Sequence, residues 1–448
     1  MNEEVRASVS EEKPSAAVWL SKTALAAYVF ALFWMKTPLW LNGMPAIVCD
    51  LVYLVAAAAW LVAFVTGRTK LHWHPAFWLL ILYFAAMLLS GMFSPDPRTS
   101  AIKLATQLYL LSLPVLVFNL VRTSSDFRRM SVAWLAGSGI VATIGVGTLL
   151  LFPFFGWNSF LAAPLHNFGT LPAGLYPRLE TTFLLPSIMV NYLTVSLVLL
   201  ILSYRLGWIA RTPAIVLGVS IWLTALFGLT PGFGGLMAML AAWLWYDWRA
   251  DKPNFARLSL AAAFGFTLLM VVVASFTTTM QPNAKFLVKI HGLPPLSSAV
   301  RFNAWIDAIA TFRSAPFVGR GPGLDTVHTY YFNPTDPVTH PQVYQYVNDA
   351  HNLYLNVAAE FGIAGIALAL AITAYVTRKM IKAVVARREQ LFGLSAAFVS
   401  CFAVQGLVGS FEDTRSMWVL LGLVLFADRM DVGPSETARE PSAPGSSP

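Results

Sequence analysis

Charged residues and cysteines are scarce in this sequence. Asp, Glu, Lys and Arg together make up 12% of the 448 residues, whereas about 25% is usual for soluble globular domains. Apolar residues make up 57%, which excludes an ordinary soluble domain and indicates a membrane protein. The two cysteines, Cys49 and Cys401, both fall within long apolar runs, so no disulfide framework is expected.

Motifs for several kinds of chemistry are also missing. The segment GRGPG at 319–323 lacks the Lys and the Ser or Thr of a phosphate-binding loop. Asp325 and His328 stand three apart, but no acidic pair with metal-ligand spacing occurs in an outer loop, so neither a metal nor a cofactor is expected. The net charge of +8 comes from dispersed basic residues, without the cluster that a nucleic-acid partner requires.

Long apolar runs dominate the sequence. A run of about 20 residues crosses a bilayer as a helix, and twelve such runs predict an all-α, polytopic membrane protein. The predicted spans are 17–36, 46–66, 75–93, 101–120, 131–153, 182–203, 213–229, 235–248, 257–275, 352–377, 391–409 and 416–428. The eighth and the twelfth are the shortest of these and carry the least evidence.

The distribution of Lys and Arg predicts the orientation. With the N-terminus inside, 20 of the 30 basic residues fall on inner segments, as the positive-inside rule requires, so both chain ends are predicted to be cytoplasmic. Residues 1–16 are a polar segment before an uncleaved first anchor, and 17–428 form one membrane domain. Residues 429–448 are largely Pro, Ser and Gly and are predicted to be disordered.

One outer segment is much larger than the others. Residues 276–351 hold four of the seven histidines and form the predicted large outer loop. Within it, residues 298–314 predict an amphipathic helix that lies on the bundle or in the membrane interface. The predicted apolar face consists of Val300, Trp305, Ile309 and Phe312.

Arginines at the outer face are candidates for binding phosphate. A transferase at this face has no nucleotide substrate, so its donor must arrive already activated, and a lipid-linked diphosphate is the natural form. Arginine forms bidentate hydrogen bonds with phosphate oxygens, and Arg178 and Arg301 stand just before the sixth span and at the start of the amphipathic helix. For either arginine, a role as an interface anchor is an equally good interpretation. For Arg98 and Arg313 the interface anchor is the preferred interpretation.

The segment DAHNLYLNVAAEFGIAG at 349–365 carries ionisable residues into the tenth span. If Asn348 or Asp349 caps this helix, His351 lies in the first turn, where the helix dipole favours the neutral imidazole. A neutral imidazole is a general base for a sugar hydroxyl, although an interfacial histidine that only hydrogen-bonds a neighbour is the more common case. Glu360 lies about 13 Å deeper on the other side of the helix, so a structural role in the protein interior is expected.

The same segment resembles the signature of the O-antigen ligase and O-antigen polymerase superfamily, in which the histidine, the asparagine, the glutamate and two glycines recur. RFNAWIDAIATFRSAPFVGRGPG at 301–323 and PRLETTFLLPSIMVNYL at 177–193 are also similar to segments of this family, so the resemblance covers most of the chain. It implies a glycosyltransferase of the GT-C type in the bacterial inner membrane, with its active site facing the periplasm.

The resemblance also implies roles for individual residues. The reaction would be a metal-independent, inverting transfer from a glycan on undecaprenyl diphosphate to the lipid A core oligosaccharide or to a growing glycan. His351 would activate the acceptor hydroxyl, while Arg178 and Arg301 would bind the diphosphate. The supporting residues would be Asn352, Glu360, Trp305, Arg320 and Arg415.

One departure from the family concerns an arginine. Many members carry one in a Ser-Arg-Gly stretch after the seventh span, where this chain has Pro231 and Gly232. Arg320 and Arg415 are the candidates for replacing it.

Other functions stay open at this point. An O-antigen or exopolysaccharide polymerase would use the same displacement with another acceptor, and a related subfamily transfers glycans to protein hydroxyls. A transporter or flippase of lipid-linked glycans is the rival from another class. Transporters usually show internal repeats and polar sites at the bilayer midplane, whereas this sequence shows no clear repeat and its unusual polar residues gather at the outer end.

Overall fold

The computed structural model of the chain describes residues 15–36, 39–41, 44–156, 160, 163–165, 178–228, 230, 232–250, 257, 260–269, 299–324, 329–332, 344–347 and 349–430. Within these, the side chains of residues 39–41, 44–46, 299–303, 329–332 and 344–347 are outside the description. Most of the predicted outer loop 276–351 and nearly all of both predicted terminal segments also lie outside the described residues.

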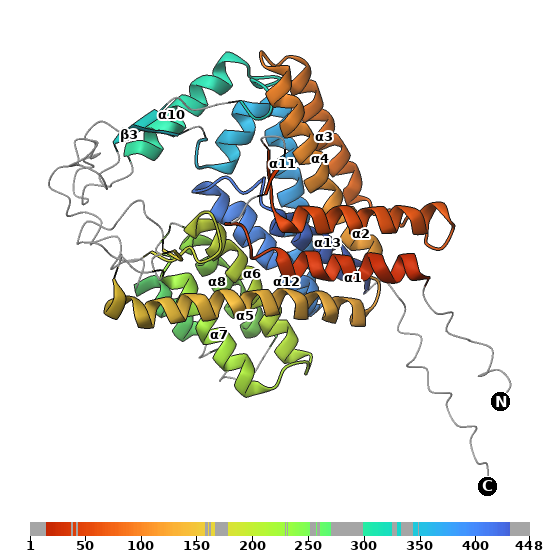
Figure 1. The fold of residues 1–448 in the computed structure, drawn as a ribbon, viewed down its shortest axis with the longest axis vertical. Helices are drawn as coiled ribbons and strands as arrows, with labels where there is room; N and C mark the ends of the chain where they lie inside the picture. Colours follow the sequence, from red (N-terminus) through yellow and green to blue (C-terminus); the bar gives the residue numbers. More distant parts are fainter. Residues whose placement is uncertain are drawn as a thin grey trace, which may run out of the picture.

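Helices make up most of the described chain (Figure 1). They are α1 (Ala16–Ala31), α2 (Val48–Val65), α3 (Ala76–Met92), α4 (Pro97–Leu120), α5 (Ser124–Phe155), α6 (Pro186–Arg205), α7 (Arg211–Leu226), α8 (Phe233–Arg249), Leu260–Leu269, α10 (Ala299–Ser314), α11 (Leu353–Val385), α12 (Glu389–Phe398) and α13 (Arg415–Met430). A π-helical turn η3 (Val399–Val404) and a 3-10 turn η4 (Gln405–Leu407) follow α12. Two short antiparallel hairpins pair β1 (Leu39–Leu41) with β2 (Met44–Ala46) and β3 (Thr329–Phe332) with β4 (Tyr344–Val347).

The predicted all-α class is confirmed, and each predicted span coincides with a helix. The short eighth and twelfth runs are α8 and α13. Among the described residues, six helices are long and apolar enough to cross a membrane: α2, α4, α5, α6, α11 and the stretch Glu389–Leu407. A total of twelve spans therefore stays a prediction.

Apolar side chains cover the outside of the bundle as well as its core. Leu54, Leu61, Val62 and Val65 on α2 are all more than half exposed, while α6 and α13 are buried over most of their length. Exposed apolar surface of this extent requires an apolar surrounding, and a bilayer supplies one.

Polar contacts define one end of the bundle, where α1 begins and α13 finishes. Lys22 of α1 pairs with Asp126 at the start of α5 at 2.8 Å. Arg429 at the end of α13 donates to the carbonyl of Val121, the residue that closes α4, at 2.9 Å. We call this the terminal end.

The opposite end holds the candidate functional residues, and we call it the site end. Here Arg415 at the start of α13 pairs with Asp50 at the start of α2 at 2.7 Å, and Lys36 pairs with Glu180 at 2.8 Å. Figure 1 shows α10 and β3 far from the start of α1.

Helix α10 is the predicted amphipathic helix, and its packing face was predicted in part, since Trp305 packs against the buried contact with the α11 segment. Ala304 and Ala308 are fully buried against Ala350 and Ala359 of the α11 segment, whereas Ile309, predicted on the apolar face, is exposed. Small side chains form this contact because they let the two helix backbones approach closely.

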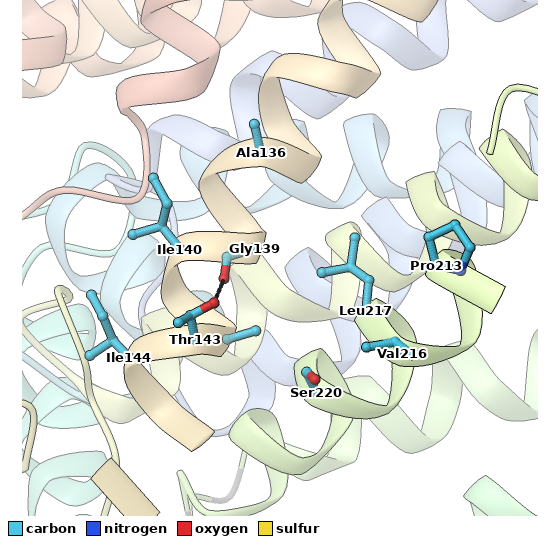
Figure 2. A pocket seen from close by; sticks show the side chains of 10 residues that line it. Ala136, Gly139, Ile140, Thr143, Ile144, Pro213, Val216, Leu217 and Ser220 are labelled. Atoms are coloured by element: carbon cyan, nitrogen blue, oxygen red, sulfur yellow. Dashed lines mark hydrogen bonds between the residues drawn. The ribbon is translucent and has the colours of Figure 1, made fainter. Parts of the chain in front are cut away.

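A cavity of about 530 Å³ opens between the middle of α5 and α7 (Figure 2). Its walls are almost entirely apolar, with Gly139 and Ile140 on α5 facing Val216 and Leu217 on α7. Thr143 directs its hydroxyl to the carbonyl of Gly139 at 2.8 Å. None of the predicted site residues lines this cavity, so it is separate from the candidate site.

Candidate functional site

Helix α11 begins later than a cap at Asn348 or Asp349 would place it. Its N-cap is Asn352, whose side-chain oxygen accepts from the amides of Tyr354 at 3.0 Å and Leu355 at 3.1 Å. The Asn352 amide group also donates to the carbonyl of Leu407 at 3.0 Å. The predicted placement of His351 in the first turn was therefore wrong, because the cap follows the histidine. Asn352 supports the site by fixing the helix start.

His351 projects from the site end in an unusual backbone conformation. Its φ is +46°, in the left-handed region that few residues other than glycine adopt. The side chain is 41% exposed, and Nδ1 lies 3.1 Å from Oδ1 of Asp349. A carboxylate at this distance from Nδ1 favours the tautomer that carries its proton on Nδ1 and leaves the lone pair on Nε2.

Helix α11 is interrupted at Gly362, where φ is +67° and ψ is −162°. The segment 316–323 supplies partners for the backbone groups around the break. The amide of Arg320 donates to Ala359 O at 2.9 Å, that of Gly321 to Glu360 O at 3.1 Å, and Ile363 N donates to Pro316 O at 2.8 Å. Irregular backbone is tolerated at such a place when other protein groups satisfy it, so this segment and α11 form one unit.

Glycine is required at the centre of this contact. A Cβ on Gly319, whose φ is +73°, would come within 2.2 Å of the carbonyl oxygen of Glu360. A Cβ on Gly362 would come within 2.4 Å of the carbonyl oxygen of Phe317. These obstacles are backbone atoms and not mobile side chains, so the segment packs here only because both residues lack a side chain.

Glu360 lies in the protein interior, as expected, and is 5% exposed. One carboxylate oxygen accepts from the Asn356 side chain at 3.2 Å and the other from the amide of Gly323 at 3.3 Å. Its carbonyl accepts from the hydroxyl of Ser90 at 2.6 Å. Glu360 therefore joins α11, α3 and the segment 316–323, which is a structural role.

A second buried carboxyl group reaches the same asparagine from the loop before α13. Glu412 is 2% exposed and accepts from the Asn356 side chain at 2.7 Å. Burial, assisted by the charge of neighbouring Asp413, raises the pKa of Glu412 to about 8. Asp413 itself forms an ion pair with Lys103 of α4. The loop 408–414 is thus tied to both α11 and α4.

The arginines have different surroundings. Arg415 makes a bidentate contact with Asp50, with both distances 2.7 Å. Arg178 is half-buried. The backbone amide of the next residue, Leu179, donates to the carbonyl of Phe227 at 2.8 Å. Arg320 is exposed, with its backbone fixed on α11. Arg301 lies in the first turn of α10, and its side chain is outside the described residues.

The region of the missing arginine is filled by a different side chain. A Cβ on Gly232 would come within 2.5 Å of the side-chain nitrogen of Gln405. That amide donates to Ser187 O at 3.0 Å, and its oxygen accepts from Asn191 at 3.1 Å. A larger residue at 232 would have to displace the Gln405 amide from these contacts, while Pro231 lies outside the described residues.

Sequence reasoning missed several residues of this site. Asp349 was considered only as a helix cap. An aspartate side chain can also accept from the backbone amide two residues later, which forms an Asx turn, and here that amide belongs to His351. Asn356, Lys103 and Glu412 gave no local signal, because their partners are distant in the sequence. Trp305 packs beside the alanine contact between α10 and α11. In the described residues, no group of three or more His, Cys, Asp or Glu side chains is arranged to hold a metal ion.

These features define a class: a polytopic, all-α membrane protein with an exposed histidine and several arginines at one end of its helix bundle. Residues 189–370 match the family model described as O-antigen ligase. This match covers less than half of the chain and supports membership in the O-antigen ligase family, in agreement with the resemblance. The match includes Arg301, Arg320, His351 and Glu360 but ends before Arg415. Members of the family are glycosyltransferase-like enzymes. No curated protein matches the chain.

Proposed function

We propose that this protein is an O-antigen ligase, which transfers a glycan from undecaprenyl diphosphate to the lipid A core oligosaccharide at the periplasmic face of the bacterial inner membrane. The observation that carries this proposal is the exposed imidazole of His351 at the head of α11, within the region that matches the family. An exposed side chain at the end of a membrane helix is accessible to two large substrates, one of which is a lipid.

The proposed reaction is a single displacement. Nε2 of His351 takes the proton of the acceptor hydroxyl, and the oxygen attacks the anomeric carbon of the donor sugar. The bond from that carbon to the diphosphate breaks, and its electron pair leaves with undecaprenyl diphosphate, which inverts the configuration. In this proposal Arg178 and Arg301 bind the diphosphate and stabilise its developing charge, so that no metal ion is needed.

The remaining arginines receive different roles in the proposal. Arg320 is the better candidate for replacing the family's missing arginine, because it is exposed. Arg415 is already engaged with Asp50, so we assign it to the support of the site. Asn352 and Glu360 support the site through the contacts that fix the start of α11 and the segment 316–323.

A polymerase would carry out the same displacement with a growing glycan as acceptor, and gene deletion separates the two functions. Lipopolysaccharide with core but no O-chain supports the ligase, whereas core carrying a single repeat indicates the polymerase. Unchanged lipopolysaccharide excludes both and points to an exopolysaccharide or to a transporter of lipid-linked glycan.

A purified transfer assay tests the residue roles. His351→Ala is expected to abolish transfer while membrane insertion is retained, and a fully active variant would refute the assignment of the base. Arg301→Ala is expected to weaken donor binding and turnover. Arg301→Lys should restore little of either, because lysine cannot form the bidentate contact.

The proposed orientation has its own test. Cysteines introduced at exposed positions, one at each end of the bundle, should react selectively with impermeant reagents. Labelling of Phe317→Cys from the periplasm and of Val385→Cys only after the cells are opened is the expected result. The reverse pattern would place His351 on the wrong side for this reaction.

A further inference from the structure

We propose that Asp349 is the positioning residue for His351, which it holds as the Nδ1-protonated imidazole with Nε2 directed outward to receive the proton of an acceptor hydroxyl. The inference rests on the proposed function in assigning His351 as the base. The geometry that carries it is independent of any substrate.

Two hydrogen-bond donors and the Nδ1 atom of His351 surround a single oxygen of Asp349. Oδ1 accepts from the backbone amide of His351 at 2.5 Å and lies 3.1 Å from Nδ1 of the same residue. The hydroxyl of Ser410, from the loop after η4, donates to it at 3.4 Å. One carboxylate oxygen therefore fixes both the backbone and the ring of His351, and a distant segment contacts the same oxygen.

The backbone around His351 is fixed from the other side too. Leu353 N donates to Gly409 O at 3.1 Å, and the Asn352 side chain donates to Leu407 O. His351 thus lies between two anchored neighbours in a left-handed conformation. Such a conformation costs about 1–3 kcal/mol and persists where the surrounding contacts determine it. The direction of the ring is therefore set before any substrate binds.

The chemistry of the pair fits base catalysis. When Nε2 takes the acceptor proton, the ring becomes an imidazolium, and the adjacent carboxylate stabilises its positive charge. Asp349 is not protonated in this step, and the Nδ1 proton stays on the ring. The same division of roles between histidine and aspartate operates in serine proteases.

A purely structural role for Asp349 makes a different prediction. If the aspartate only stabilises the turn, then Asp349→Asn should behave like the native protein, because the asparagine Oδ1 can accept the same hydrogen bonds from the amide of His351 and the hydroxyl of Ser410. If the negative charge supports the imidazolium, then Asp349→Asn retains the turn but loses turnover. Asp349→Ala removes both contributions.

The first experiment measures transfer by the full chain in lipid nanodiscs, with a glycan on undecaprenyl diphosphate as donor and lipid A core as acceptor. For Asp349→Ala we expect kcat to fall about 100-fold, and for Asp349→Asn about tenfold, with little change in KM. Asp96→Ala is the matched control, since Asp96 accepts from the amides of Arg98 and Thr99 at 3.1 and 3.2 Å without a histidine beside it. Turnover of Asp349→Asn equal to that of this control would overturn the inference, whatever the turnover of Asp349→Ala.

The second experiment needs no substrate. Diethyl pyrocarbonate modifies unprotonated imidazole nitrogens, and mass spectrometry of the peptide that contains His351 gives the rate of modification. We expect this rate to fall severalfold in Asp349→Ala and to stay native in Asp96→Ala. A native rate in both variants would overturn the proposed orientation. If His351→Ala transfers glycan normally, then the proposed function fails, while this measurement still judges the role of Asp349.

Discussion

Replacing Gly319 by alanine tests whether the segment 316–323 is built onto the break in α11. The added Cβ would come within 2.2 Å of the carbonyl oxygen of Glu360. Because this oxygen belongs to a buried backbone, the segment must lift away from α11. The hydrogen bonds that Arg320 and Gly321 donate to α11 would then be lost.

The expected magnitude follows from these contacts. A left-handed alanine costs about 1–2 kcal/mol relative to glycine, and each buried backbone group left without a partner costs about 1–3 kcal/mol. With two such hydrogen bonds broken, we expect Gly319→Ala to lower the free energy of unfolding by about 3–8 kcal/mol. This is a large share of the roughly 5–15 kcal/mol typical of folded proteins.

Gly67 is the matched control for this measurement. Its φ is +70°, close to that of Gly319, but a Cβ there meets nothing within 4 Å. Gly67→Ala should therefore lose only the conformational part, about 1–2 kcal/mol. Thermal or denaturant unfolding of the variants in the same detergent gives the comparison. If Gly319→Ala proves no less stable than Gly67→Ala, the close packing of this segment on α11 is refuted.

Three further predictions concern the contacts around the site. Since the pKa of Glu412 is raised to about 8, its contribution to stability is complete below about pH 4.5 and is lost as the pH rises through 8. Glu412→Gln should make this decline smaller in unfolding experiments between pH 5 and 9, and an unchanged decline would contradict the prediction. Arg415→Lys should lower the melting temperature and leave the KM for the donor unchanged, because Arg415 is engaged with Asp50, whereas a raised KM would indicate direct donor contact. Asn352→Ala should cost about 1 kcal/mol of stability through the lost helix cap, and Asn352→Asp, which can still cap the helix, should recover most of this loss. If Asn352 acted only through the contact with Leu407, Asn352→Asp would recover nothing.

Much of the site could be predicted from the sequence because its signals are local. His351 and Glu360 stand in one short motif, and the buried position predicted for Glu360 is confirmed, while the outer position of His351 stays a prediction. The placement of the histidine within the first turn failed because Asn352, Asp349 and Asn348 are all good caps. The helix begins after Asn352, whose amide reaches the distant Leu407, and no local rule contains that contact.

The sequence by itself determined the all-α membrane class and the approximate positions of most helices, because hydropathy and backbone hydrogen bonding in a membrane are properties of contiguous residues. It also determined which ionisable residues stand near the outer ends of helices. Tertiary structure decided what those residues contact. Asp50 and Arg415 are 365 positions apart, and Asn356 meets Glu412 across 56. Folding brings such groups together because each buried polar group must find a partner wherever the packed helices supply one.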